Sequence, residues 1–270
     1  MNSYNTLSNL KTILQITSST NDTLLLDYLI GASREVDGPT GANRFFYAQS
    51  ATKYFEQPHF DELLLPDLLS LSAVSVTENG DWTDEESWTE SSHFELTPYN
   101  DFPKHGMVLL DIGYKSWPSA QKSIKLTGVW GYGDGESADP WEASAATGTL
   151  DSTSDTSLTV DSATGLAVGQ TLKIEDEQVF CTALSGTTLT VERGKNGTTA
   201  AAHTSKAVYI AKYPKDVQLA TLHFAAEMWK TSWAAGFQSR QIGDYREVLA
   251  RMNPQTRENI LARVHRFTLG

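Results

Sequence analysis

Apolar residues at helical spacing occur near the start of the chain and predict helices there. Leu7, Leu10 and Leu14 are three and four residues apart, which predicts a short helix over about residues 7–15. A second helix is predicted over about residues 22–36. Its apolar stripe has 4-3-4 spacing and consists of Leu25, Leu29, Ala32 and Val36. The Gly-Pro-Thr-Gly sequence at 38–41 ends this helix.

Three further helices are predicted after residue 213. The first has Pro214 in its first turn, and Gly236 ends it. Its apolar stripe has 3-4-3-4 spacing and consists of Leu219, Leu222, Ala226, Trp229 and Trp233. A shorter helix is predicted over Tyr245–Met252. Asn253-Pro254 is a helix-start signal, so the last helix is predicted from there to about Phe267.

Between these helices the hydrophobic period changes to two, which is typical of strands. Residues 44–133 contain aromatic-rich and alternating segments such as Ile124–Trp130, and Asn79-Gly80 predicts a hairpin turn. The proline in Leu63–Leu69 indicates an edge or connecting segment. Residues 144–210 are rich in Thr, Ser, Gly and Ala, and short strands are predicted there at 157–160, 171–174, 179–183, 188–191 and 207–210.

These elements predict an α+β fold. We expect an antiparallel-like helical bundle built from the N- and C-terminal helices, because each helix has an apolar stripe that must be covered. A β-rich excursion leaves this bundle, and a small β-barrel-like module is inserted into it. The predicted domains are a helical-bundle core with its β-region at 1–143 and 211–252, an inserted β-module at 144–210, and a C-terminal helix or tail at 253–270.

Composition narrows the class of protein. A composition of 40% hydrophobic and 10% aromatic residues is typical of a folded globular chain. The single Cys excludes a disulfide framework and a Cys-based zinc site. The first residues, MNSYNTLSNL, lack a secretory signal pattern. No apolar run approaches the roughly 18 residues that span a bilayer. We therefore expect a soluble protein of a reducing compartment.

The charge of the chain is unevenly distributed. The net charge of −12 argues against a general nucleic-acid binder, which needs a basic face. Residues 1–210 hold 12 basic and 28 acidic residues, a net charge of −16, whereas residues 211–270 hold 9 basic and 5 acidic residues, a net charge of +4. An acidic body with a basic tail suits self-association, docking on an acidic partner, or solubility alone.

Candidate chemistry is sparse, so we predict no enzyme, no cofactor and no metal site. The six histidines show no metal-ligand spacing, no Gly-x-Ser-x-Gly motif occurs, and Cys181 reads as a small apolar filler. The acidic sequence Asp81–Glu86 has carboxylates that suit Ca²⁺, but a solvated loop is the favoured interpretation. The Gly-rich sequence Gly131–Glu136 lacks the Lys and helix start of a phosphate cradle, and we expect a turn.

Two surface features keep alternative interpretations open. Trp82 and Trp88 flank the acidic loop, where they either mark a contact surface or anchor the loop to a sheet. The arginines of the last helix and its approach form either a solvated face or a docking tail for an acidic surface, and they are Arg251, Arg257, Arg263 and Arg266.

Four segments in order resemble the phage head–tail connector family, whose members are also called adaptor or head-completion proteins. They are the capped helix pair at 7–46 (LSNLKTILQITSSTNDTLLLDYLIGASREVDGPTGANRFF), the strand at 122–134 (KSIKLTGVWGYGD), the helix at 213–232 (YPKDVQLATLHFAAEMWKTS) and the segment at 242–249 (IGDYREVL). The resemblance covers about 200 of the 270 residues. Residues 144–210 depart from the compact family pattern and look like a small β-module of phage structural proteins.

The resemblance implies a structural protein of the virion neck, assembled in the host cytoplasm. Members of this family form a ring, usually of twelve copies, beneath the portal protein, and a stopper or tail-completion protein follows. Double-stranded DNA passes through the lumen without sequence-specific binding. The resemblance assigns portal docking to the C-terminal segment, here Arg251, Arg257, Ile260, Leu261, Arg263, Val264, Arg266 and Phe267. Candidate acidic residues for the lumen or a neighbour are Asp81, Asp84, Glu85, Glu86, Asp134 and Glu136.

Two rival functions remain. A receptor- or carbohydrate-binding module is suggested by the Thr-rich segment and the Trp residues, although residues 144–210 contain only Phe180 and Tyr209 as aromatic residues for sugar stacking. A hydrolase is disfavoured because the sequence has no clustered acid–base set.

Overall fold

The computed structural model describes residues 2–58, 61–110, 115–232, 239–242, 245–248, 261–262 and 264–265. The chain divides into two compact units. The helix–barrel unit consists of Met1–Phe45, Trp141–Lys195 and Thr199–Gly270, and the sheet unit consists of Phe46–Pro140 with Asn196–Thr198. The two units are described separately below.

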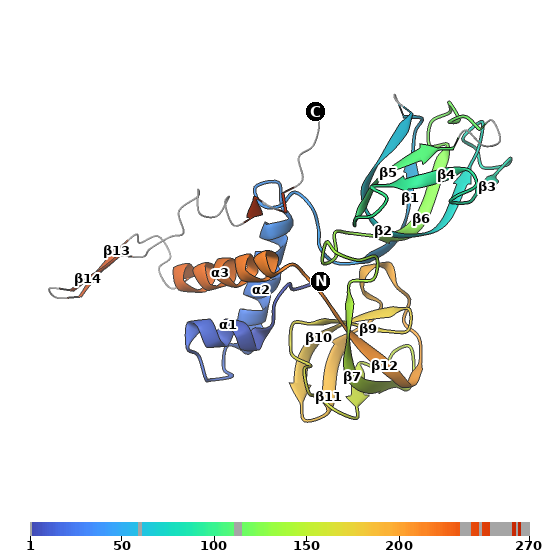
Figure 1. Cartoon of the computed structure of the whole chain (residues 1–270). Helices are drawn as coiled ribbons and strands as arrows, with labels where there is room; N and C mark the ends of the chain where they lie inside the picture. Colours follow the sequence, from blue (N-terminus) through green and yellow to red (C-terminus); the bar gives the residue numbers. More distant parts are fainter. Residues whose placement is uncertain are drawn as a thin grey trace. The chain divides into compact units, whose positions relative to one another are not determined.

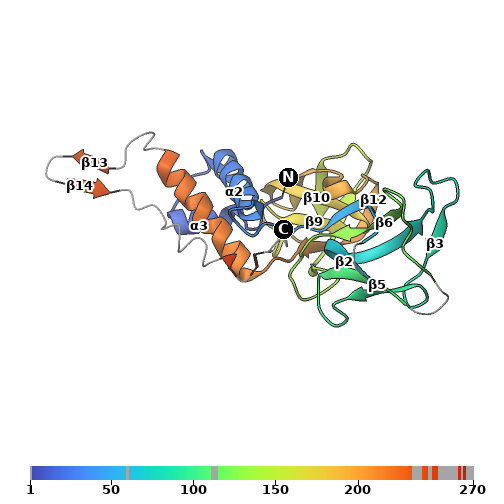
Figure 2. The same ribbon diagram turned by 90° about the horizontal axis from the view of Figure 1, so that it is seen from above.

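Three helices of the helix–barrel unit pack on one another. They are α1 (Leu7–Leu14), α2 (Asp22–Asp37) and α3 (Lys215–Ser232), and both views show α2 and α3 side by side (Figures 1 and 2). Thr6 caps α1 by accepting a hydrogen bond from the Asn9 amide. The N-terminal segment is fixed against α2, because the Tyr4 hydroxyl donates to Asp37 at 2.6 Å and the Tyr4 amide donates to the Ser33 hydroxyl at 3.1 Å.

The buried face of α3 differs from the predicted stripe. Leu219 is 51% exposed, whereas Val217, Ala220 and Phe224 are buried. Small residues on the buried face allow α3 to approach α2 closely, and Ala32 of α2 is fully buried. Tyr28 of α2 then meets Trp229 of α3 edge to face at 6.1 Å. The predicted helix was therefore confirmed over Lys215–Ser232, and its buried face was predicted only in part. Its predicted end at Gly236 and the stripe residue Trp233 lie outside the described residues.

The helix–barrel unit also contains a closed antiparallel barrel (Figure 1). Its strands follow the order β10-β11-β8-β7-β12-β9. Their bounds are β7 (Trp141–Leu150), β8 (Ser157–Val160), β9 (Thr171–Ile174), β10 (Glu177–Ser185), β11 (Thr188–Glu192) and β12 (His203–Ala211). The interior is aliphatic, with Leu158, Leu172, Ile174, Val179 and Leu189 fully buried. Closure removes the open edges that strands of this small module would otherwise expose.

The sheet unit contains a six-stranded sheet in the order β1-β6-β2-β5-β4, with β3 paired to β2. The strands are β1 (Gln49–Phe55), β2 (Glu62–Val76), β3 (Glu86–Trp88), β4 (Phe94–Thr97), β5 (Lys104–Leu109) and β6 (Ile124–Trp130). Alternation along β6 buries Ile124, Leu126 and Trp130. The alternating strand predicted over Ile124–Trp130 is confirmed.

The proline-containing segment 63–69 is not an edge or a connection. It belongs to β2, which lies between β5 and β6. The prediction was wrong because Pro66 sits at an irregularity, where the β2–β5 register shifts between Leu64 and Leu68. A bulge accommodates a residue that cannot donate to the ladder.

The predicted helix over residues 245–252 is also wrong. Tyr245–Val248 is strand β14, which pairs with β13 (Ser239–Ile242) in a two-stranded hairpin. Gly243-Asp244 between two short segments is a hairpin signal that the helical spacing of the apolar residues concealed. Most of the predicted last helix, over residues 253–267, lies outside the described residues.

The predicted fold class is corrected accordingly. The structure is mostly β, with 37% strand and 20% helix, and its described residues contain three α-helices rather than a bundle built from N- and C-terminal helices. The helical stripes were overweighted, because a few long helices carry a stronger periodic signal than many short strands. The closed barrel and the six-stranded sheet are the main architecture.

Candidate functional site

The predicted acidic residues all lie in the sheet unit. Asp81, Asp84 and Glu85 belong to the connection between β2 and β3, and Asp134 and Glu136 belong to the connection after β6. Residues 46–140 contain five basic and 16 acidic residues, a net charge of −11. The remaining residues hold 16 basic and 17 acidic residues, a net charge of −1. Almost all of the net charge of −12 therefore belongs to one unit.

The acidic β2–β3 connection is ordered by its own hydrogen bonds. Asp81 accepts from the Thr83 amide at 3.0 Å and from the Thr83 hydroxyl at 2.7 Å, and these bonds hold the pKa of Asp81 below its ordinary value. Asp84 accepts a hydrogen bond from the Thr77 hydroxyl. The side chains of Asp81 and Asp84 are exposed, so the loop presents its acidic residues to solvent.

Two acidic residues of this region are paired with lysines. Lys125 donates to Glu85 at 2.5 Å, and Lys115 donates to Glu86. Each hydrogen bond lowers the pKa of its glutamate. Asp81 and Asp84 are the other two predicted acidic residues of this loop. In the described contacts they accept hydrogen bonds from threonines rather than from lysines.

The second predicted acidic segment forms a turn. Asp134 accepts hydrogen bonds from the amides of Glu136 and Ser137 at 3.0 and 3.1 Å. Gly131, Gly133 and Gly135 all have positive φ, which explains why glycine recurs there. The sequence prediction of a turn rather than a phosphate cradle is confirmed.

The two tryptophans that flank the acidic loop differ in role. Trp88 is 5% exposed, stacks on His93 at 6.1 Å and contacts Trp117, so it anchors strand β3. Trp82 is half-buried in the loop, where it meets Tyr54 edge to face at 5.5 Å and has the Lys125 ammonium 4.7 Å from its ring centre. Only Trp82 therefore contributes to the surface.

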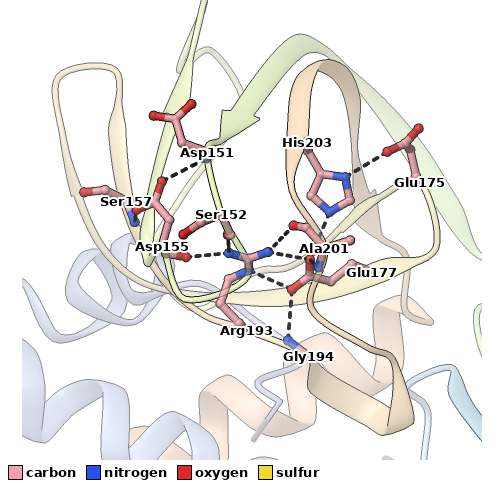
Figure 3. Close-up of polar contacts among 10 residues, drawn as sticks. All are labelled: Asp151, Ser152, Asp155, Ser157, Glu175, Glu177, Arg193, Gly194, Ala201 and His203. Atoms are coloured by element: carbon pink, nitrogen blue, oxygen red, sulfur yellow. Dashed lines mark hydrogen bonds and ion pairs between the residues drawn. The ribbon is translucent and has the colours of Figure 1, made fainter.

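A cluster of buried ionised groups occupies one end of the barrel (Figure 3). Arg193 follows β11 and forms a bidentate pair with Glu177 at the start of β10, with both N–O distances 2.7 Å. The guanidinium also donates to three backbone carbonyls, those of Ser152, Asp155 and Ala201, at 2.9, 2.5 and 2.5 Å. All five of its N–H donors are thus used, and the arginine ties three loops together.

His203 completes the cluster from the start of β12. Its Nδ1 lies 2.9 Å from Glu175 and its Nε2 lies 2.9 Å from Glu177, and the side chain is 2% exposed. Each ring nitrogen of His203 thus faces a carboxylate oxygen. Glu175 also pairs with Lys206 at 2.7 Å.

Glu177 is the centre of this cluster. Burial alone would raise its pKa, but hydrogen bonds from Arg193, from the Ala201 amide, from His203 and from the Gly194 amide outweigh burial and lower the pKa from 4.5 to about 2. The carboxylate accepts five hydrogen bonds within 3.0 Å. A carboxylate and a guanidinium with every donor and acceptor satisfied are a structural clamp, because neither has a lone pair or proton to offer a substrate.

Sequence reasoning missed this clamp. The histidines show no metal-ligand spacing, and the segment 144–210, which contains all four residues of the cluster, was interpreted only as a β-module. Glu175 and Glu177 are two residues apart, which places both near the same end of the barrel, but nothing in the sequence indicates that Arg193 and His203 return to them. Cys181 is buried inside the barrel, and burial raises the pKa of its thiol to about 12, consistent with a filler role.

The predicted portal-docking residues lie mostly outside the described residues. This applies to Arg251, Arg257, Ile260, Arg263, Arg266 and Phe267. Leu261 and Val264 are described, and they are 2% and 6% exposed. These two apolar residues are therefore covered by the chain itself rather than presented to solvent.

Among the described residues, no group of His, Cys, Asp and Glu side chains has the arrangement needed to hold a metal ion. In the same part of the chain, no helix combines the length and the apolar character that crossing a membrane requires. Comparison of the sequence with protein-family models and with curated proteins, and of the fold with solved structures, found no match.

Proposed function

We propose that the protein is a structural head–tail adaptor of a tailed phage, which forms a ring beneath the portal, joins the capsid to the tail and lets DNA pass. The observation that carries this proposal is the packing of α1 and α2 against α3, which begins about 180 residues later. The two helices near the start of the chain thus contact the helix that follows the last barrel strand. This arrangement agrees with the resemblance of residues 7–46 and 213–232 to the connector family.

The charge of the sheet unit supports the same role. A surface with a net charge of −11 repels DNA phosphates, so a channel wall of this kind does not retain the passing duplex. In the described contacts, Asp81 and Asp84 accept hydrogen bonds from threonines rather than from lysines, and Asp134 and Glu136 belong to the same predicted acidic set. They are the proposed channel-facing or neighbour-facing residues.

Docking on the portal through the C-terminal segment requires that two buried residues of this segment first become accessible. Leu261 and Val264 are buried in the single chain, so they become available to a portal only after the segment leaves its place. The arginines of the segment make the first contact with an acidic portal surface in this proposal. The apolar residues then follow, because their burial against the portal replaces their burial against the chain.

The test is assembly with the portal protein of the same phage. The protein is mixed with purified portal, and complexes are measured by light scattering and by negative-stain microscopy. Twelve copies of a 29.7-kDa chain give a ring of about 360 kDa, and we expect this mass to add to that of the portal. A chain lacking residues 253–270 should not bind. Failure of the full chain to bind, or equal binding by the truncated chain, would overturn the adaptor role or the docking role respectively.

A further inference from the structure

An aromatic pair stands at one edge of the sheet unit, on the strand that has no outer neighbour. Tyr54 of the edge strand β1 is 52% exposed and is aligned across the ladder with Lys125 of β6. Trp82 meets Tyr54 edge to face, and the Lys125 ammonium lies over Trp82. Trp82 and Lys125 therefore hold Tyr54 in place while more than half of the tyrosine remains accessible.

The loop that supplies Trp82 is held in one conformation. Asn79 accepts a hydrogen bond from the Asp81 amide at 3.0 Å, and Asp81 in turn accepts from Thr83. Trp82 itself has φ of 65°, a left-handed conformation that bulky residues rarely adopt. Strained backbone of this kind persists where the surroundings impose it, and it often occurs at ligand clamps. The strain positions the indole against Tyr54.

A pocket of about 400 Å³ lies beyond the end of β1, the strand that carries Tyr54. It is lined by Glu56, Gln57, Pro58, Ser119, Ala120 and Gln121. Glu56 and Gln57 follow Tyr54 within three residues, at the end of β1. Gly80 of the Trp82 loop lies against the other wall, since a Cβ at Gly80 would be 2.6 Å from the carbonyl oxygen of Gln121. The pocket is thus close along the backbone to both aromatic residues, through Glu56 to Tyr54 and through Gly80, which contacts Gln121, to Trp82.

The chemistry of the lining selects one class of ligand. Amide, hydroxyl and carboxylate groups of Gln57, Gln121, Ser119 and Glu56 both donate and accept hydrogen bonds, as the hydroxyls of a sugar require. An exposed aromatic ring offers a flat apolar surface for the C–H face of a sugar ring. The volume falls within the usual range of about 300–1,000 Å³ for small-molecule pockets. The net charge of −11 on this unit disfavours phosphates and acidic sugars.

We propose that Tyr54, Trp82 and the adjoining pocket bind a neutral saccharide. The site is independent of the adaptor role, and its place differs from the Thr-rich segment 144–210 that sequence reasoning considered for sugar binding. Tyr54 is the stacking residue. Trp82 is a positioning residue that acts by holding Tyr54, and Gln121 and Glu56 bond the hydroxyls of the sugar.

The experiment is saturation-transfer NMR on the full chain with five probes. Four are neutral: maltotriose, cellotriose, triacetylchitotriose and mannotriose. The fifth is an anionic chondroitin hexasaccharide. We expect saturation transfer to at least one neutral probe, with a dissociation constant in the millimolar range or tighter, and none to the anionic probe. Absence of transfer to all four neutral probes, or preference for the anionic one, overturns the proposal.

Variants locate the binding. Tyr54→Ala should weaken binding of the best probe at least tenfold, Tyr54→Phe should retain it within about threefold because the ring remains, and Gln121→Ala should weaken it several-fold. The matched control is Tyr99→Ala, because Tyr99 is 67% exposed in the same unit but lies in the β4–β5 connection. Unchanged melting curves confirm that each variant folds. Equal binding by Tyr54→Ala and the unaltered chain excludes the site.

Discussion

Replacing Arg193 by methionine tests whether the ionic clamp holds the barrel together. The substitution keeps much of the side-chain volume but removes the bidentate partner of Glu177, which is 1% exposed. Breaking a buried ion pair by removing one partner costs about 3–5 kcal/mol, because the remaining charge is left without compensation. Three backbone carbonyls, those of Ser152, Asp155 and Ala201, also lose their donor. We expect a loss in the upper part of this range.

The measurement is hydrogen exchange on the full chain, followed for peptides that cover residues 191–203. A loss of about 3–5 kcal/mol accelerates exchange through unfolding of the barrel by about two to three and a half orders of magnitude. The matched control is Lys206→Met, which breaks the exposed pair with Glu175, where both side chains are 46% exposed. Exposed pairs contribute less than about 1 kcal/mol. Similar, small effects of the two substitutions would refute the assignment of Arg193 as a clamp.

Three further predictions concern pH and the C-terminal segment. The pKa of Glu177 is about 2 in the folded protein against 4.5 when unfolded, so its stabilising contribution is present above pH 4.5 and lost as pH falls toward 2. With screening at the barrel end, we expect this contribution to be about 2 kcal/mol. Urea unfolding at pH 6 and pH 3 should show the difference, and Glu177→Gln should abolish it. Burial raises the pKa of Asp37 to about 7, against the opposing effects of Arg34 and Tyr4. The contribution of Asp37 to the free energy of unfolding is therefore present below pH 3.8 and lost as pH rises through 7. Asp37→Asn should remove this part of the pH dependence in urea titrations, and an unchanged profile would contradict the prediction. Leu261→Ala should destabilise the packing around Leu261 by about 2 kcal/mol or more, seen as faster tryptic cleavage at the C-terminal arginines, with Ala262→Gly as the exposed control.

The division of charge between the two units changes the interpretation of the uneven charge along the sequence. From the sequence alone, the contrast was between residues 1–210 and the last 60 residues. The structure places the barrel strands, with their paired glutamates, in the nearly neutral helix–barrel unit. The negative charge is concentrated in the sheet unit, where five lysines face 16 acidic residues. An electrostatic role therefore belongs to the sheet unit rather than to the whole body of the chain.

Local patterns in the sequence determined many individual elements. The strands predicted at 157–160 and 171–174 match β8 and β9, and the stripes over residues 7–15 and 22–36 match α1 and α2. These predictions succeed because side-chain alternation and helical spacing depend on neighbours within a few residues. Where two local signals competed, as at Tyr245–Val248, the sequence favoured a helix and the chain forms a strand.

Only the tertiary structure decided what those elements enclose. Pro66 is tolerated in a central strand because the ladder is irregular there, and Leu219 is exposed because smaller residues of α3 face α2. Glu177 meets Arg193 and His203 over separations of 16 and 26 residues, and Tyr54 meets Trp82 over 28, so no local pattern reveals either cluster. The sequence determined many of the individual strands and helices. The closure of the barrel and the pairing of the sheet, which join distant residues, decided which side chains are clamped inside and which remain at the surface.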